Sequence, residues 1–240
     1  MNLVIDQGNT LTKVALFDGE EMVSFRSMAV FGTAGLEALV RENSVDRAIF
    51  SSVSGSGDSD FGLLKMLIPQ SMRLDTNTPL PFVNLYATPE SLGKDRVAAV
   101  AGAIGRYPRE NLLVIDAGTA ITFELVTSDN RYVGGNIAPG MQMRFKALNQ
   151  FTGKLPLYAP MDNVDTMGNT TQTAIVAGVQ NSMVFEIEGY MQYLVRQYPG
   201  IKTILTGGDS EFFARNLKYP IFVHQNLVLE GLNRILKHNA

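Results

Sequence analysis

The sequence of 240 residues contains no cysteine and only two histidines, His224 and His238. A chain without cysteine forms no disulfide framework, no thiolate zinc site and no cysteine nucleophile. Two histidines are too few for histidine-rich metal chemistry. The net charge of −3 argues against a broad basic surface, so we expect no nucleic-acid partner.

Long apolar runs are also missing from the sequence. No segment approaches the roughly 20 uninterrupted apolar residues of a membrane span. Residues 1–6 carry neither the basic segment nor the apolar stretch of a signal peptide. We therefore expect a cytoplasmic protein with no membrane partner. Its 45% hydrophobic and 18% charged residues are ordinary for a globular chain, whose length suits one large domain or two small ones.

An internal repeat is the most informative pattern that is present. The segment 3–8 (LVIDQG) recurs as 113–118 (LVIDAG), which is an offset of 110 residues. The same offset places Thr12 opposite Thr122. Two chance occurrences of a common buried-strand sequence are the alternative, but four identical consecutive residues followed by a matching glycine favour a duplication.

Each copy of the repeat predicts a strand, a tight glycine turn after an aspartate, a return strand and then a third strand. The third strands begin near Met22 and near Tyr132. The remaining pattern predicts a mobile loop over 54–59, strands over 47–53 and 203–206, and helices over 35–42, 61–68, 96–106, 142–151, 171–197 and 227–237. This alternation is typical of the α/β class, with halves at 1–110 and 111–240.

The first aspartate turn has the composition of a phosphate site. Asp6 ends a predicted strand, and Gly8, Asn9 and Thr10 follow it with free backbone N–H groups and neutral donors. Lys13 adds a positive charge nearby, and Asp6 could hold Mg²⁺ or its water. The alternative is an ordinary hairpin with Asn and Gly as turn formers. The sequence contains neither a Walker P-loop nor a dinucleotide fingerprint.

A second cluster, Gly93-Lys94-Asp95-Arg96, stands at the start of a predicted helix. A carboxylate there can take a proton from a substrate hydroxyl, while the arginine fork binds a substrate carboxylate. A surface ion pair that complements the helix dipole is the alternative.

Three segments of the second half are rich in turn formers. Asp116 to Thr119 repeats the aspartate turn and could place Thr119 on a phosphate oxygen. Residues 134–140 fit either close backbone packing or ligand approach, or else a tight loop before a helix. Residues 206–209 fit either a turn or a nucleoside-binding edge.

Four of these motifs, taken in chain order, resemble the type III pantothenate kinases. They are Asp6-x-Gly8-Asn9-Thr10-x-x-Lys13, Gly93-x-Asp95-Arg96, Asp116-x-Gly118-Thr119-Ala120-x-Thr122 and Gly134-Gly135-x-Ile137-x-Pro139-Gly140. The resemblance implies a duplicated ribonuclease H-like fold, that of the actin-like ATPases and sugar kinases, with two similar halves and a cleft between them.

The resemblance also implies how ATP and cations bind. Thr119 matches a second ATP contact, Asp116 a monovalent-cation ligand for K⁺ or NH₄⁺, and Asp6 a ligand of Mg²⁺, directly or through water. The ATP phosphate loop corresponds to Asp6, Gln7, Gly8, Asn9, Thr10, Leu11, Thr12 and Lys13.

The substrate site follows from the same resemblance. Asp95 matches the general base, and the family completes its pantothenate pocket with the partner subunit of a homodimer. The positions that match substrate contacts are Tyr86, Gly93, Lys94, Asp95, Arg96 and Thr171. Lys94 departs from the family, which often has a small apolar residue there, so the charge beside the base is altered.

The predicted function is ATP-dependent phosphorylation of pantothenate to 4′-phosphopantothenate, the first step of coenzyme A biosynthesis. The alternatives are another small-molecule kinase or phosphatase of the same superfamily, acting on a sugar or a polyphosphate, and a non-catalytic nucleotide-binding regulator. Phosphoryl transfer needs mainly in-line positioning and charge neutralisation, for which we expect Asp95 to align and deprotonate the alcohol and the loop from Gly8 to Thr10 to hold the phosphates.

Overall fold

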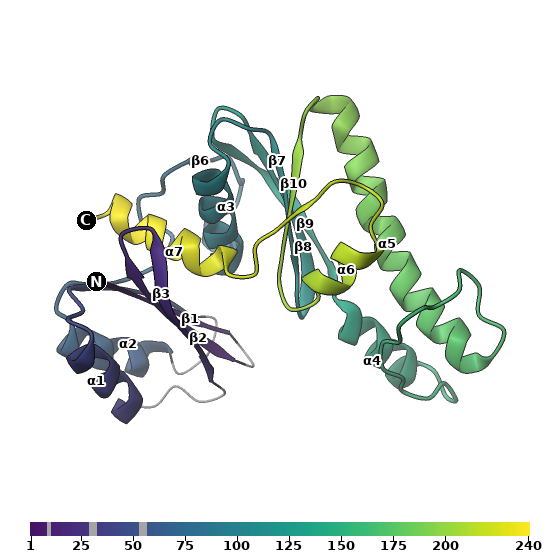
Figure 1. Cartoon of the computed structure of the whole chain (residues 1–240), viewed down its shortest axis with the longest axis horizontal. Coiled ribbons are helices and arrows are strands. Elements are labelled where there is room, and N and C mark those ends of the chain that lie inside the picture. Colours follow the sequence, from purple (N-terminus) through teal and green to yellow (C-terminus); the bar gives the residue numbers. More distant parts are fainter. Residues whose placement is uncertain (9–10, 29–32, 53–56) are drawn as a thin grey trace. The chain divides into compact units, whose positions relative to one another are not determined.

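The computed structural model describes residues 1–8, 11–28, 33–52 and 57–240 (Figure 1). The chain divides into two compact units. The first comprises residues 1–109, 129–133 and 226–240, and the second comprises 110–128 and 134–225. The C-terminal helix thus belongs to the first unit, whereas the sequence-based division at 110/111 assigns it to the second half.

The first unit is built on a five-stranded sheet with the order β3-β2-β1-β4-β5. Strand β1 is antiparallel to β2 and parallel to β4. The strands are β1 (Asn2–Gln7), β2 (Thr12–Asp18), β3 (Glu21–Met28), β4 (Arg47–Ser52) and β5 (Ser71–Arg73). The helices of this unit are α1 (Thr33–Glu42), α2 (Gly57–Leu67), α3 (Lys94–Arg106) and α7 (Leu227–His238), with a short 3₁₀ turn at Pro89–Ser91.

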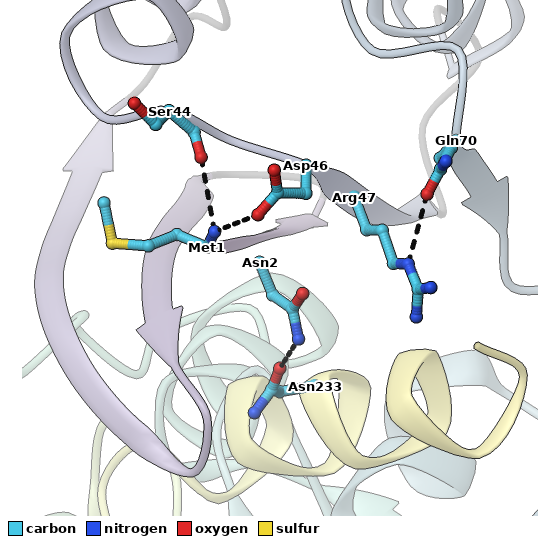
Figure 2. Close-up of polar contacts among 7 residues, drawn as sticks. All are labelled: Met1, Asn2, Ser44, Asp46, Arg47, Gln70 and Asn233. Carbon is cyan, nitrogen blue, oxygen red and sulfur yellow. Dashed lines mark hydrogen bonds and ion pairs between the residues drawn. The ribbon is translucent and has the colours of Figure 1, made fainter.

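Strand β1 is covered on both faces, which explains its uninterrupted apolar sequence. Leu3 and Ile5 pack with Leu36 of α1 and Leu64 of α2 in one core, and α7 packs against β1 as well. Figure 2 shows how the start of the strand is held: the Met1 amino group contacts Asp46 at 2.5 Å and the Ser44 carbonyl at 3.2 Å.

Helices α3 and α7 cross at two glycines. A Cβ on Gly102 would overlap the carbonyl oxygen of Leu227, and a Cβ on Gly231 would overlap that of Ala98. The two backbones therefore approach more closely than any other residue type allows. The small residues of the sequence over 96–106 are explained by this crossing.

The second unit repeats the arrangement of the first. Its sheet has the order β11-β10-β7-β8-β9, and β6 (Val83–Asn84) adds to residues 131–132 at the start of β9. The strands are β7 (Leu112–Ala117), β8 (Ala120–Thr127), β9 (Arg131–Pro139), β10 (Lys202–Thr206) and β11 (Phe222–Val223). The helices are α4 (Met141–Phe151), α5 (Thr171–Gln197) and α6 (Ser210–Asn216). Each strand of the first sheet has its counterpart in the second, which confirms the duplication.

The two copies differ by one residue in the turn, and the prediction that Thr12 corresponds to Thr122 is wrong. Asp6 pairs with Lys13 across the first hairpin, whereas Asp116 pairs with Thr122 across the second. The turn of the second copy is therefore one residue shorter. Because side chains alternate between the faces of a strand, a residue missing within a strand would turn its buried side chains outward, whereas a residue missing in the turn leaves the buried face of both strands unchanged. Thr122 is therefore the counterpart of Lys13.

Most predicted elements are present, and the main difference lies at α2. This helix begins at Gly57, so residues 57–59 belong to its first turn rather than to the predicted loop; residues 54–56 lie outside the described part of the chain. Asp58 and Asp60 in this turn complement the helix dipole. Within the described residues, no helix is long and apolar enough to cross a bilayer.

Candidate active site

Asp6 lies at the carboxyl end of β1, between Lys13 on β2 and Ser51 on β4. The pKa of its carboxyl group is raised to about 6, mainly by burial, which the Lys13 charge opposes; the Asp95 carboxylate adds to the rise, and a hydrogen bond with Ser51 lowers the pKa. Two carboxylates of the first unit therefore share one electrostatic environment, and a cation or a proton between them would be stabilised.

The described residues on either side of the turn after β1 lie close together. The Gly8 N–H donates to the Leu11 carbonyl at 3.0 Å, and a Cβ on Gly8 would lie 3.2 Å from the same oxygen. Leu11 is exposed and Thr12 is buried. The predicted phosphate contacts Asn9 and Thr10 lie outside the described residues, so the structure describes only the two ends of the expected cradle.

The side chain of Gln7, next to this turn, forms two hydrogen bonds with neighbouring elements. Its side-chain Nε2 donates to Asp60 at 2.7 Å, and its Oε1 accepts from the Ser52 hydroxyl at 2.7 Å. The side chain is buried. The amide therefore links β1 to α2 and β4, a structural role for this side chain that the sequence did not suggest.

Asp95 occupies the first turn of α3 and is exposed. Its Oδ1 accepts the Arg96 backbone N–H at 2.9 Å, and a Cβ on Gly93 would lie 2.5 Å from that oxygen. Glycine at position 93 thus leaves the space that the carboxylate occupies.

Arg96 is buried and contacts two tyrosines. Its Nη2 donates to the Tyr132 hydroxyl at 2.9 Å, and the guanidinium lies 5.4 Å from the centre of the Tyr86 ring. The two rings stack with centroids 6.0 Å apart and planes 9° apart. Cation–π contact and hydrogen bonding together fix the direction of the guanidinium.

Tyr132 is the residue of this cluster that sequence reasoning missed. It is fully buried and lies on β9, 36 residues after Arg96. The sequence marked it only as the start of a strand. The pairing of β6 with β9 brings Tyr132 close to Tyr86, and a two-residue strand such as β6 leaves no periodic signal in the sequence.

Lys94 interacts with a different group of charges from its neighbour Asp95. Burial and the Arg73 guanidinium lower its pKa, and Asp75 and Asp58 oppose this shift. The departure from the family pattern at Lys94 is therefore accommodated by charges on α2 and around β5.

The second unit has an equivalent strand edge. Asp116 ends β7, opposite Thr122 on β8 and beside Thr206 on β10. The backbone of Gly207, whose φ is +94°, comes so close that a Cβ there would overlap the Asp116 carboxylate. The cross-strand neighbour of Asp116 is a neutral hydroxyl, where Asp6 has the Lys13 ammonium.

The glycine-rich segment over 134–140 forms most of strand β9, so the tight-loop interpretation is wrong. The close-packing interpretation is confirmed at Gly140. Its N–H donates to the Thr119 carbonyl at 3.2 Å, and a Cβ would overlap the Gly118 and Thr119 carbonyl oxygens. Gly140 thereby fixes the second aspartate turn, in which Thr119 is exposed.

Residues 206–209 form a turn before α6. The Ser210 N–H donates to the Gly207 carbonyl at 3.2 Å, and the Asp209 N–H donates to the Ala117 carbonyl at 2.9 Å. Burial raises the pKa of Asp209. The Ser210 hydroxyl is buried and has no hydrogen-bond partner among the described residues.

Thr171 is the first residue of α5 and is exposed. The preceding Thr170 and Thr173 form a capping box that fixes the start of the helix. Thr171 lines a mostly apolar groove of about 830 Å³ between α4 and α5, together with Arg144, Phe151 and Ile175.

The structure therefore brings Asp6, Lys13, Asp95 and the Tyr86–Arg96 pair into the first unit, and places Asp116, Thr119 and Thr171 in the second. Duplicated mixed sheets, each with an aspartate near the carboxyl end of its central strand, are the fold of the actin-like ATPase and sugar kinase class.

The comparisons with known proteins agree with this class and narrow it. The model of the type III pantothenate kinase family matches residues 2–193, and the chain belongs to this family. It is 47% identical over 239 residues to a type III pantothenate kinase of Bacteroides fragilis, covering 100% of this chain and 98% of that relative. A Cytophaga hutchinsonii relative of the same name is 39% identical, with full coverage of both chains.

Solved structures show the same fold at low sequence identity. A Campylobacter jejuni protein described as a Baf family transcriptional activator has a TM-score of 0.67 and 21% identity, covering 99% of this chain and 98% of that one. Component A of (R)-2-hydroxyglutaryl-CoA dehydratase from Acidaminococcus fermentans has a TM-score of 0.53 and 16% identity, covering 98% and 96%.

Proposed function

We propose that this protein phosphorylates pantothenate with ATP, giving 4′-phosphopantothenate for coenzyme A biosynthesis. Membership of the type III pantothenate kinase family supports the substrate. The observation that carries the chemistry is the pairing of Asp95 with Asp6: one exposed carboxylate for the acceptor, beside one enclosed carboxylate that suits a cation.

In this proposal Asp95 is the general base. It accepts the proton of the pantothenate primary hydroxyl as the hydroxyl oxygen attacks the γ-phosphorus and the β–γ bridging oxygen leaves with ADP. The hydrogen bond from the Arg96 backbone N–H fixes the direction of the carboxylate. The backbone of the Gly8 turn and Lys13 stabilise the phosphate charge that develops during transfer.

Arg96 recognises the carboxylate of pantothenate in this proposal. A guanidinium has five donors in a rigid fork that matches a carboxylate, and the contacts with Tyr86 and Tyr132 define its direction before the substrate arrives. Sugars have no carboxylate, so this recognition distinguishes pantothenate from the substrates of other kinases with the same fold.

Two cations complete the proposed site. The residues fit Mg²⁺ at Asp6, because its carboxyl is enclosed and has a second carboxylate nearby, and Mg²⁺ binds proteins through one or two carboxylates. Mg²⁺ neutralises phosphate charge when bound. The Asp116 carboxylate fits K⁺ or NH₄⁺, since its cross-strand neighbour is neutral. Thr119 provides a contact to ATP in addition to those of the phosphate loop, residues 6–13, which includes Gln7 and Gly8.

We also propose that the protein works in the cytoplasm as a homodimer in which the partner subunit completes the pantothenate pocket. Support comes from the exposed face of α5 and the apolar groove beside it, where Thr171 lies as a substrate contact.

The experiment that tests the function is an ATP-dependent phosphorylation assay with Mg²⁺, comparing pantothenate with a panel of sugars in potassium, ammonium and sodium buffers. We expect phosphorylation of pantothenate and of none of the sugars, with faster turnover in K⁺ or NH₄⁺ than in Na⁺. Product from sugars alone would contradict the substrate. Binding of ATP without any turnover would favour a regulator, the function named for the Campylobacter jejuni structure.

A further inference from the structure

The first unit contains a second polar pocket. It has a volume of about 460 Å³ and lies between α3, α7 and the turn that joins β2 to β3. Arg106 at the end of α3 and Glu230, Asn233 and Arg234 of α7 line it. Asp95 is at the first turn of α3 and Gly102 is the α3 residue of the pocket nearest to it in sequence, so about 10 Å of helix separates this pocket from the proposed base.

Arg234 is the unusual group in this pocket. Its Nε–H is buried and has no hydrogen-bond acceptor, and no hydrogen bond or ion pair joins its guanidinium to the described part of the chain. The guanidinium lies against Gly105, where a Cβ would be 3.0 Å from Nη1. An enclosed donor without an acceptor carries a free-energy penalty that a bound anion would remove.

The other charged and amide groups of the pocket already have partners. Arg106 forms two hydrogen bonds with Glu230, at 2.7 and 2.8 Å. Glu20 pairs with Lys237. Asn233 accepts from Asn2, as Figure 2 shows, and donates to the Gly19 carbonyl at 2.9 Å. These pairs cancel in charge, so the positive charge of Arg234 is the one left for a ligand.

We propose that this pocket binds a small organic anion through Arg234, with one carboxylate or phosphate group held by the guanidinium fork. Carboxylate and phosphate oxygens both match the bidentate geometry of arginine. The volume exceeds that of an isolated phosphate and falls within the range of small-ligand sites. The backbone of Gly102 and Gly105 and the ring of Phe17 supply walls for the remainder of such a ligand.

The first test uses ¹⁵N-labelled protein and follows the Nε–H resonance of Arg234, assigned by its absence in Arg234→Lys. Inorganic phosphate and propionate, the two probes, are titrated separately to about 20 mM. A hydrogen bond to a formerly unbonded Nε–H moves its proton resonance downfield. A saturable downfield shift with either probe supports the proposal, and no shift with both overturns it.

The second test is thermal stability. At a probe concentration about ten times its Kd, a one-site ligand raises Tm by about 3–5 °C for a chain of this size. We expect the probe to raise the Tm of Arg234→Gln less than that of the wild type, because the variant lacks the guanidinium that binds the probe. Arg26→Gln, at an exposed arginine of β3, should keep the full rise in Tm. Equal shifts in both variants would overturn the proposal.

A kinase assay separates this inference from the proposed function. Arg234→Gln should keep kcat and KM for pantothenate within about twofold when no probe is present, because the side chain lies at the far end of α3 from Asp95. A protein that binds propionate but does not phosphorylate pantothenate would support the pocket while contradicting the kinase assignment.

Discussion

The carboxyl group of Asp6 is kept in an unfavourable environment by the fold. Its pKa is about 6 in the folded chain, against 3.8 for an ordinary aspartate, and the main cause is burial. The folded protein therefore binds a proton at Asp6 more tightly than the unfolded chain does. Stability from this group is complete below pH 3.8 and is lost as the pH rises through 6.

Asp6→Asn should consequently stabilise the ligand-free protein at neutral pH. A shift of about two pKa units corresponds to about 3 kcal/mol, so we expect the free energy of unfolding to rise by up to about 3 kcal/mol above pH 7. The difference from wild type should disappear below pH 4. Urea unfolding between pH 3.5 and 8 without Mg²⁺ measures both curves. A constant offset at every pH would contradict a penalty that arises from ionising the buried carboxyl.

Asp95 is the residue whose replacement should affect turnover most. Asp95→Asn keeps the shape of the side chain and removes the base, so kcat should fall at least about a hundredfold while ATP affinity stays nearly unchanged. Steady-state kinetics and calorimetric ATP titration measure the two quantities. Asp18→Asn, at the exposed last residue of β2, is the control. Near-normal turnover in Asp95→Asn would remove it from the role of base.

Much of this residue-level chemistry is predictable from sequence because it sits in short local motifs. In the sequence, Asp6 and Asp116 precede a glycine turn and Asp95 stands at a helix start. The structure has Asp6 and Asp116 near the carboxyl ends of β1 and β7, and Asp95 in the first turn of α3. Tyr132 could not be predicted, because its contact with Arg96 depends on a pairing between distant segments.

Among the elements, the long helices and buried strands were predictable and the short pieces were not. The bounds of α5 agree fully with its apolar periodicity and with the threonine cap before it. Strands β5, β6 and β11 have three residues or fewer, and their place is set by neighbouring strands rather than by their own sequence.

The crossing of α3 and α7 gives an element-level prediction. Gly231→Ala places a methyl group against the Ala98 carbonyl, so the helices must separate, and we expect at least about 2 kcal/mol of destabilisation. Gly62→Ala in α2 is the matched control. Its added Cβ meets no atom within 4 Å, and helix propensity should give about 0.5–1 kcal/mol of stabilisation. Urea unfolding of both variants checks the signs, and a gain from Gly231→Ala would contradict the crossing.

For the whole molecule, the exposed apolar side chains of α5 bear on assembly. Phe185 is 56% exposed and Tyr193 is 62% exposed, and Gly178, Ser182 and Gly189 lie near them along the same helix. A charge in this face should disfavour the proposed dimer, since a buried unpaired carboxylate is costly.

Phe185→Glu should therefore convert the dimer to a monomer at micromolar concentration and reduce pantothenate turnover at least about tenfold. Light scattering coupled to size exclusion measures the mass, and the kinase assay measures the second effect. Gln197→Glu, exposed at the end of the same helix, should change neither. A wild-type monomer with full activity would contradict the homodimer.

The place of α7 also has a consequence for synthesis of the chain. This helix completes the core of the first unit, yet 120 residues, 107–226, separate it from its partner α3. On the ribosome the second unit emerges before α7 can dock. Until then the face of the first sheet that α7 covers stays exposed. We therefore expect the first unit to complete its folding last, although its synthesis begins first.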